Sequence, residues 1–591
     1  MCGYIGTVSN HDIDTSKIKE VNKHIQCRGP DETVVLDSQK ENTINSNNIN
    51  FAFIFNRLAI LDLSDLASQP MYSKKFNTAV LFNGEIFNHN ELRNELELKG
   101  VQFLSNNSDS EVVLLGISYF GKEFIKKLIG QFAISFIDFN TNEILLIRDR
   151  LAQKPLFYHY DKEGLTFSSN LKSIQKLKLS SIDEESLNQY LLFGVVPTPK
   201  TIFKDIYKLN PGEIIKYSFE KDHLEKEIYW NPKDFVSNEE FKSFEFFELF
   251  QNAVSIRQEA DVPVANFLSG GLDSTAIVKS LFDKGYKANT YSLGFSNPKY
   301  DETKWSNKVS ELYNTNHWQE ILAEDISAND IINSIKLFDE PYSDPSTLPS
   351  YIISKAISKK YKVAISGDGG DELLGGYTRI NMVMDSKFST LSYLNKIYPP
   401  YLGTGNFFLK RSSKLKEAYA SFFEDMKFMD LLNIPINNIY QDLYFHELDN
   451  DYKSLLLSDY LFYLPQMMML KIDRTSMANS LETRSPFVDH RLVEYVMSRD
   501  TEYYSRKIKK PIIHEYLKND FNSEFLSRRK MGFVFQIEDW VYNNIELIFN
   551  SIEQNSITSQ WSSKLNKLLL HKSRINANRI WKIYFLSVYF E

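Results

Sequence analysis

The most restrictive feature of this chain is an apolar strand that runs through a glycine loop directly into a helix. The segment VANFL-SGGLDS-TAIVKSLF spans residues 264–282. Two later apolar runs, TYSLGF and KVAIS, are likewise followed by a helical or glycine-rich segment. Alternation of strands and helices predicts an α/β domain, with a parallel sheet covered by helices on both faces. Residues 380–591 read as mostly helical and predict a largely helical C-terminal part.

The first 215 residues have a different pattern. The strands FAISFIDF and EILLIRD flank Asn140-Thr141-Asn142, a hairpin signature, and a second hairpin is expected at 155–169. This is an α+β pattern of stacked antiparallel sheets between helices. We therefore predict an N-terminal domain over 1–215, a polar linker over 216–240 and the α/β domain over 241–591.

Composition excludes several classes of protein. Two cysteines cannot form a disulfide framework, so we expect a reducing, cytoplasmic location. The start of the chain lacks a signal peptide, and the richest apolar stretch, 455–470, contains Ser, Asp, Pro and Gln. That stretch predicts a core helix, so no membrane association is expected. A net charge of −8 argues against nucleic acid as a partner.

Cys2 stands at an unusual position. Removal of Met1 would place its thiol beside its own α-amine, which has an ordinary pKa of about 7.7–8.0. A nucleophile that carries its own base needs no histidine partner. The alternative is that Cys2 is a small apolar residue at the start of a strand.

Five further segments follow Cys2 in order. They are CRGPD (27–31), NRLAILD (56–62), NGEIFNH (83–89), SDSEV (108–112) and RDRLAQKPLFY (148–158). Together with Cys2 they resemble the glutaminase domain of the amidotransferases that use an N-terminal cysteine. Two departures, Gln26-Cys27 and Ala152-Gln153, touch neither the nucleophile nor its neighbours, and Cys27 is interpreted as structural.

This resemblance implies a role for each matching residue. Arg57 would pair with the α-carboxylate of glutamine, a bidentate contact suited to arginine. Glu85 and Asp109 would hold the α-ammonium. The Asn83 amide and the Gly84 N–H would form the oxyanion hole. The glutamine-binding segment would also include Leu58, Ala59, Ile60 and Leu61.

The loop SGGLDS has the geometry of a phosphate site. Gly270 and Gly271 allow close backbone approach, and N–H groups at the helix start face an anion. It lacks the Gly-Lys-Ser/Thr of a Walker loop. Ser269 and Ser274 can donate hydroxyl hydrogen bonds, and Asp273 can hold Mg²⁺. The loop resembles the pyrophosphate loop of ATP pyrophosphatases.

A second loop, SGDGGDELLGGY (366–377), completes the expected ATP site. Asp371 would be the other carboxylate on Mg²⁺. The same resemblance implies nucleotide contacts for Ser366 and Gly367 and adenine contacts for Leu268 and Leu293. Lys510 matches a transition-state lysine. Lys471 and Arg474 are weaker candidates, because a solvated helix face explains them equally well.

The chain resembles the glutamine-hydrolysing asparagine synthetases over nearly its whole length. In both, the glutaminase site comes before the ATP site in the sequence. The resemblance implies that ATP activates a carboxylate as an acyl-adenylate, which ammonia then attacks after travelling through an internal passage. It also suggests a homodimer with small-molecule substrates. Beta-lactam synthetases share the architecture but lack the nucleophilic cysteine.

The sequence does not identify the acceptor carboxylate. Asp368, in the catalytic position where the best-studied members carry Glu, is one methylene shorter. The segment 339–351 lacks an arginine that would suit the α-carboxylate of aspartate. Three hypotheses stand: asparagine synthesis, amidation of another carboxylate such as a sugar acid of a surface polysaccharide, and a catalytically silent homologue.

Overall fold

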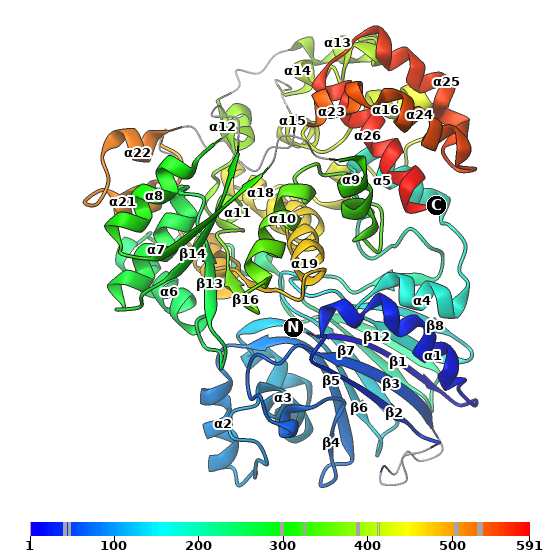
Figure 1. Cartoon of the computed structure of the whole chain (residues 1–591), viewed down its shortest axis with the longest axis vertical. Helices are drawn as coiled ribbons and strands as arrows, with labels where there is room; N and C mark the ends of the chain where they lie inside the picture. Colours follow the sequence, from blue (N-terminus) through cyan, green and yellow to red (C-terminus); the bar gives the residue numbers. More distant parts are fainter. Residues whose placement is uncertain are drawn as a thin grey trace.

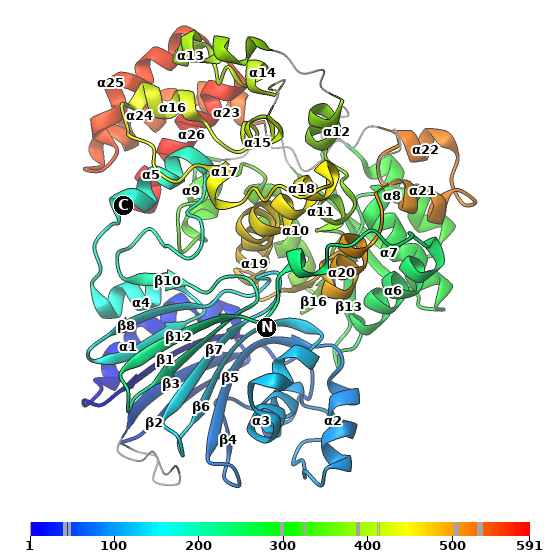
Figure 2. The ribbon, with the colours of Figure 1, turned by 180° about the vertical axis from the view of Figure 1, so that it is seen from behind.

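The computed structural model describes the chain except residues 1, 40–43, 45–48, 296–300, 323–326, 386–389, 411, 413, 502–507 and 529–535. The N-terminal sheets form one end of the molecule, and the parallel sheet and the helical part lie against them (Figures 1 and 2). The N-terminus of the described chain lies near the junction between the two parts (Figure 1).

Two six-stranded antiparallel sheets stack face to face in the N-terminal part. The first has the order β10 (Ile206–Lys208), β8 (Phe157–Asp161), β9 (Gly164–Ser168), β1 (Gly3–Ser9), β3 (Asn50–Arg57), β2 (Glu32–Asp37). The second has the order β12 (His223–Ile228), β11 (Glu213–Ser218), β7 (Glu143–Arg148), β6 (Gly130–Asp138), β5 (Thr78–Ile86), β4 (Met71–Ser73). Apolar side chains of both sheets share one core.

Helices cover the outer faces of this sandwich. Ile18 and Val21 of α1 (Thr15–Val21) pack on the first sheet, and α2 (His89–Leu98) and α3 (Asp109–Phe120) pack on the second. Both predicted hairpins are present as β6–β7 and β8–β9. Asn142 takes the left-handed conformation, with φ 52°, in the turn of the first. The predicted stacked-sheet fold is confirmed.

The second sheet continues past the boundary predicted at residue 215. β11 pairs with β7, and β12 adds the edge strand through the register Glu213↔Ile228. β12 has the sequence HLEKEI, and most of its side chains are exposed because it is an edge strand with one open side. Its polar composition therefore resembles that of a linker. We therefore propose that the domain boundary lies after Ile228.

The C-terminal part contains the predicted parallel sheet. Its order is β15 (Asn316–Leu322), β14 (Asn289–Phe295), β13 (Val264–Phe267), β16 (Val363–Ile365), β17 (Glu482–Arg484), and every neighbouring pair is parallel. Ile353 and Ile357 of α10 (Thr347–Ser358) pack on one face. The helices α7 (Leu272–Asp283) and α8 (Thr303–Leu312) pack on the other. The α/β prediction is confirmed.

Over residues 380–591 the described chain is mostly helical, as predicted, and this helical part begins a few residues earlier. The longer helices there are α12 (Thr378–Met384), α16 (Met426–Leu432), α18 (Asp451–Ser458), α19 (Leu470–Met477), α20 (His490–Ser498), α21 (Pro511–Leu517), α23 (Ile537–Asn543), α24 (Ile545–Gln554) and α26 (Arg574–Tyr589). The apolar stretch 455–470 is a buried π-helix over Asp459–Met469 between α18 and α19. The wider turn accommodates Pro465, which has no N–H to donate. In the described residues, no helix is both long and apolar enough to cross a membrane.

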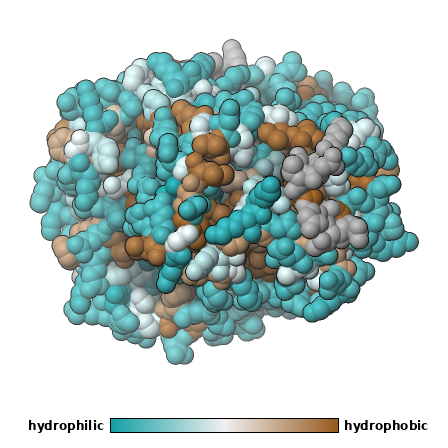
Figure 3. Space-filling model, turned by 90° about the horizontal axis from the view of Figure 1, so that it is seen from below, coloured by the Kyte–Doolittle hydropathy of each residue, from teal (hydrophilic) through white to brown (hydrophobic). Residues whose placement is uncertain are grey.

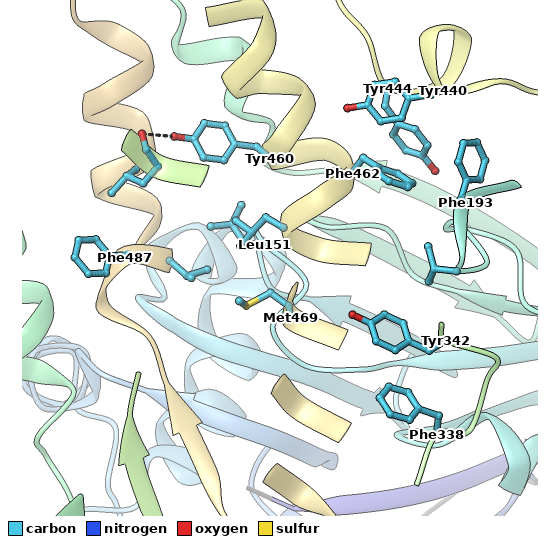
Figure 4. Packing of buried hydrophobic residues seen from close by; sticks show 14 of the residues in the cluster. Leu151, Phe193, Phe338, Tyr342, Tyr440, Tyr444, Tyr460, Phe462, Met469 and Phe487 are labelled. Carbon is cyan, nitrogen blue, oxygen red and sulfur yellow. Dashed lines mark hydrogen bonds between the residues drawn. The ribbon is translucent and has the colours of Figure 1, made fainter. Parts of the chain in front are cut away.

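One hydrophobic core is shared by the two parts. Leu151 and Phe193 of the N-terminal part belong to the same buried cluster as Met469 and Phe487 (Figure 4). The end of the molecule formed by the N-terminal domain is mostly hydrophilic, with apolar residues gathered in its central region (Figure 3). The two catalytic regions predicted from the sequence therefore belong to one continuously packed body.

Candidate active sites

Cys2 lies immediately before β1, at the face where the N-terminal domain meets the rest of the chain. Its side chain is buried, with 8% exposure, and its backbone N–H donates to Asn83 Oδ1 at 3.0 Å. Burial raises the pKa of the thiol, although a hydrogen bond from the Leu58 backbone opposes this effect. A thiol with a raised pKa needs a base to become nucleophilic.

The predicted oxyanion hole lies on the strand beside Cys2. Asn83 and Gly84 belong to β5 and pair with Ala133 and Phe132 of β6. Asn83 Nδ2 is buried and has no hydrogen-bond partner among the described residues. A Cβ on Gly84 would lie 2.1 Å from the Gln131 carbonyl oxygen, so only glycine fits there. The structure thus leaves an amide donor available for an oxyanion on the side chain that accepts the Cys2 backbone N–H.

The predicted glutamine-binding residues gather around this corner. Arg57 ends β3 and donates to the carbonyl oxygens of Ser64, at 3.0 Å, and Asp62. The segment Leu58–Leu61 follows it, and Leu58 and Ile60 pack against Val363 and Met477 of the C-terminal part. Glu85 lies two residues after Asn83, and Asp109 accepts from the Ile86 N–H at 3.1 Å.

Three residues, Arg484, Arg28 and Asp473, make contacts around the Cys2 region that the sequence motifs did not reveal. Arg484 of β17 pairs with Glu85 at 3.2 Å across the domain interface. Arg28 donates to the Cys2 carbonyl at 3.1 Å and makes a bidentate pair with Asp473 of α19 at 2.8 and 2.9 Å. These partners are hundreds of residues apart in sequence, and no local pattern marks such pairs.

Glutamine binding should weaken as the pH falls. Burial raises the pKa of the Glu85 carboxyl well above its ordinary value, despite the Arg484 guanidinium, and burial also raises that of Asp109. Both carboxyls must be ionised to hold an ammonium, so they lose this capacity at a higher pH than ordinary carboxyls do. We expect the KM for glutamine to rise as the pH is lowered from neutral toward the range in which ordinary carboxyls titrate, about 4.

Steady-state glutaminase kinetics across that range test this expectation. The Glu85→Gln variant, which cannot ionise at this position, should have a high KM at every pH and a flatter profile. A KM for glutamine that stays constant across the range in the wild-type protein would contradict the assignment.

The second predicted site forms where β13 ends and α7 begins. Gly270 has φ +72°, and a Cβ there would lie 2.6 Å from the Ser306 nitrogen. Ser269 and Ser274 have their hydroxyl oxygens 3.3 Å apart, and the Gly271 N–H donates to Ser269 Oγ at 3.2 Å. The loop is therefore tightly folded before the helix N-terminus, as a phosphate loop requires.

Three charged side chains from separate elements meet at this loop. Lys510 Nζ lies 2.6 and 2.7 Å from the two Asp273 oxygens and 2.6 Å from Asp371 Oδ1. Asp273 is in the first turn of α7, Asp371 is in α11 (Gly370–Leu374), and Lys510 precedes α21. A Cβ on Gly370 would lie 2.8 Å from Asp273 Oδ1, so glycine permits this approach of the two loops.

This donor set fits Mg²⁺ and a nucleotide. A magnesium ion that also contacts phosphates takes one or two carboxylates, and Asp273 and Asp371 would supply two. No described group of three or more His, Cys, Asp or Glu side chains has metal-site geometry, so the remaining ligands would be phosphate oxygens and water. Ser366 Oγ is buried and unpartnered among the described residues, which leaves it available to a nucleotide.

The other predicted nucleotide residues border the same loops. Leu268 directly follows β13 and donates its N–H to the Tyr291 carbonyl at 2.7 Å, and Leu293 lies on the neighbouring strand β14. Gly367 packs beside Asp273, where a Cβ would lie 3.1 Å from that of Asp273. Asp368 is half-buried in the second loop, and Ser485 donates to its backbone carbonyl.

The helix face that carries Lys471 and Arg474 is buried. Lys471 and Arg474 are 8% and 5% exposed, so the interpretation as a solvated face was wrong. Arg474 donates to both Asp339 oxygens, at 2.7 and 3.0 Å, and to Asp473 at 2.6 Å. These contacts make Arg474 an internal ion-pair residue.

A small cavity of about 10 Å³ lies between the two sites. Gln131, Gln153 and Lys154 line it from the N-terminal part. Its walls on the C-terminal side are Ser366, Met469, Ile472, Asp473, Thr483 and Ser485. Burial lowers the pKa of Lys154 to about 8, although the nearby Asp473 carboxylate opposes this effect.

Comparison with known proteins assigns each half. Residues 1–230 match the model of the glutamine amidotransferase domain, and residues 245–577 match that of asparagine synthase. Asparagine synthetase [glutamine-hydrolyzing] 1 of Bacillus subtilis (strain 168) is 28% identical over 631 residues, covering 100% of this chain and 96% of the relative. Putative asparagine synthetase [glutamine-hydrolyzing] 2 of Methanocaldococcus jannaschii is 32% identical, covering 64% and 76%. Because the second model alone spans more than half of the chain, this protein belongs to the asparagine synthase family, with a glutamine amidotransferase domain as its N-terminal half.

Proposed function

We propose that this protein amidates a carboxylate in an ATP-dependent reaction, with ammonia released from glutamine, and that the carboxylate is the side chain of aspartate. The main support for this proposal is that one packed body contains two separate sites. One contains a buried Cys2 beside the unpartnered Asn83 amide, and the other contains Asp273, Asp371 and Lys510 around a phosphate loop.

The first reaction would take place at Cys2. After removal of Met1, the α-amine accepts the thiol proton, and the thiolate attacks the glutamine amide carbon. The oxyanion that forms is stabilised by Asn83 Nδ2 and the Gly84 N–H. The C–N bond breaks, ammonia leaves with the proton, and water hydrolyses the thioester to glutamate. Arg57, Glu85 and Asp109 hold the two charged groups of glutamine.

The second reaction would take place at the phosphate loop. The acceptor carboxylate attacks the α-phosphate of ATP, pyrophosphate leaves, and ammonia displaces AMP from the acyl-adenylate. Ser269, Ser274 and the N–H groups of α7 bind the departing pyrophosphate, and Lys510 neutralises charge at the α-phosphate. Mg²⁺ held by Asp273 and Asp371 would neutralise the phosphate oxygens. The cavity beside Lys154 would form part of the internal passage for uncharged ammonia.

A second candidate is amidation of another carboxylate, such as a sugar acid. Asp368 favours this alternative, because its carboxylate reaches about 1.5 Å less far than that of Glu. A misplacement of about 1 Å can cost on the order of a hundredfold in rate. The homodimer and the cytoplasmic location expected from the sequence stay predictions.

Pyrophosphate release with aspartate as sole acceptor tests the choice between them. We expect release well above background, loss of synthesis in Asp368→Ala, and partial retention in Asp368→Glu because the longer side chain restores the reach. If aspartate supports no release while a sugar acid does, the enzyme amidates the second class of substrate, and the longer Glu should then obstruct the larger acyl group.

A further inference from the structure

We infer that Arg528 is a positioning residue of the nucleotide site, which holds the peptide between Gly270 and Gly271 in the orientation that lets the SGGLDS loop bind pyrophosphate. This inference rests on the proposed function and adds a residue to it. Arg528 directly follows α22 (Ser523–Ser527), and its Nη2 donates to the Gly270 carbonyl oxygen. A cation that is 258 residues away in sequence therefore contacts the backbone of the phosphate loop.

The guanidinium of Arg528 is held by its own surroundings. Its Nη1 donates to the Phe525 carbonyl oxygen at 2.9 Å. Its Cζ lies 4.2 Å from the centroid of the Phe525 ring and 4.7 Å from that of the Trp305 ring, and the two rings meet edge-on. Contacts with two aromatic rings favour one orientation of a planar guanidinium. Arg528 therefore presents Nη2 to the loop in a defined direction.

The peptide that Arg528 contacts has little conformational preference of its own. It joins two consecutive glycines, and Gly270 has the positive φ reported above. Glycine adopts positive and negative φ about equally readily, so a peptide between two glycines can rotate unless a neighbouring group holds it. Among the described residues, Arg528 supplies the side-chain hydrogen bond to the Gly270 carbonyl oxygen. We therefore assign to Arg528 the task of holding this peptide.

The orientation of this peptide determines where the loop hydroxyls lie. In a planar trans peptide the C=O and the N–H point in opposite directions, so a contact that fixes the Gly270 carbonyl also fixes the Gly271 N–H. That N–H donates to Ser269 Oγ at 3.2 Å, and Ser274 Oγ lies 3.3 Å from the same oxygen. Because Ser269 Oγ accepts this hydrogen bond, its own proton can be donated to a phosphate oxygen. Arg528 thus controls, through one peptide, a hydroxyl that would bind pyrophosphate.

One stretch of the chain supplies two cations to the loop. Lys510 precedes α21 and pairs with Asp273 in the first turn of α7, whereas Arg528 follows α22 and contacts Gly270 before that helix. α21 packs on α7, and α22 contacts α8 through the rings described above, so the four helices lie together (Figures 1 and 2). Positive charge on both sides of the loop favours a polyanion such as pyrophosphate.

The decisive experiment compares two ligands of the nucleotide site by calorimetric titration of the full-length protein. Magnesium pyrophosphate carries the phosphates that the loop would hold, and AMP lacks them. For Arg528→Met we expect the Kd for magnesium pyrophosphate to rise about 10- to 100-fold, because a charged hydrogen bond that orients the loop is lost. The Kd for AMP should stay within about twofold of the wild-type value. The kcat for ammonia-dependent AMP formation should fall together with the pyrophosphate affinity.

Controls separate positioning from folding. Arg528→Lys keeps a cationic donor but not the planar fork, so its pyrophosphate affinity should lie between those of Arg528→Met and the wild type. The exposed Arg574→Met, at the start of α26, is the matched change away from the loop and should alter neither Kd by more than about twofold. Glutaminase activity should be the same in all these variants. If Arg528→Met does not fold, the ratio of the two affinities in Arg528→Lys decides the question.

Each failure has a distinct meaning. If Arg528→Met binds magnesium pyrophosphate as tightly as the wild type, or loses AMP affinity to the same extent, the positioning role is wrong while the amidation stands. If the wild type binds pyrophosphate but activates no carboxylate, the proposed function fails, and the comparison of pyrophosphate affinities still decides the role of Arg528. A wild-type protein that binds neither ATP nor pyrophosphate would refute both the assignment of the loop and this inference.

Discussion

Replacing Cys2 by Ala is expected to abolish glutamine hydrolysis and glutamine-dependent amidation, with a loss of about 10⁴-fold or more, because no other group can form the thioester. Amidation with free ammonia should continue at nearly the wild-type rate. The reason is that Asp273, Asp371 and Lys510 lie in the C-terminal part, away from the strand that follows Cys2. Glutamate release and pyrophosphate release, measured on the same protein, test both statements.

Cys27→Ala is the matched control, because Cys27 is the other cysteine and is exposed. It should retain both activities. Mass spectrometry of the active protein should show a chain that begins at Cys2, since the α-amine must be free. Loss of ammonia-dependent synthesis in Cys2→Ala would instead indicate that Cys2 supports the fold, and activity in a protein that retains Met1 would contradict the proposed base.

Replacing Asp273 or Asp371 by Asn is expected to lower ATP-dependent turnover by about 10²-fold or more, because each change removes one of the two carboxylates available to Mg²⁺. It also leaves the buried Lys510 ammonium with one fewer anionic partner. Glutamine hydrolysis should persist in both variants. The wild-type products should be AMP and pyrophosphate, because the SGGLDS loop holds the departing pyrophosphate.

Chromatographic analysis of the nucleotides together with a pyrophosphate assay measures these outcomes. The exposed Asp385→Asn is a matched change away from the loop and should behave as wild type. ADP as the sole nucleotide product would refute the assignment of the loop, and full turnover in both Asn variants would remove the two carboxylates from the metal site.

Local patterns in the sequence were sufficient for the fold of each half. The glycine loop after β13 and the turn at Asn142 each require a backbone conformation that few residues adopt, so they leave a visible signature. The edge strand β12 was missed because its exposed side chains need not be apolar, and its pairing with β11 is decided by backbone hydrogen bonds.

Contacts between the halves could not be predicted in the same way. Arg484 lies on β17 of the C-terminal part, whereas its partner Glu85 lies on a strand of the other domain. Arg28 and Asp473 are each common residues in an unremarkable local context, and only the folded chain brings them together beside Cys2. From the sequence, Lys471 could be either a site residue or part of a solvated helix face. Helical periodicity does not show what a charged face packs against.

The shared interior has a consequence for any attempt to divide this protein. A chain cut in the segment after Ile228 would yield two fragments, each with part of one buried cluster open to water, including Leu151 and Phe193 on one side and Met469 and Phe487 on the other. Each fragment would also contain buried charges without their ion-pair partners, because Arg28 would be separated from Asp473 and Glu85 from Arg484. Exposed apolar area of this kind promotes association, so the pieces should aggregate or reassemble rather than survive as independent modules. The boundary between the two domains along the sequence is therefore not a boundary between two independently stable units.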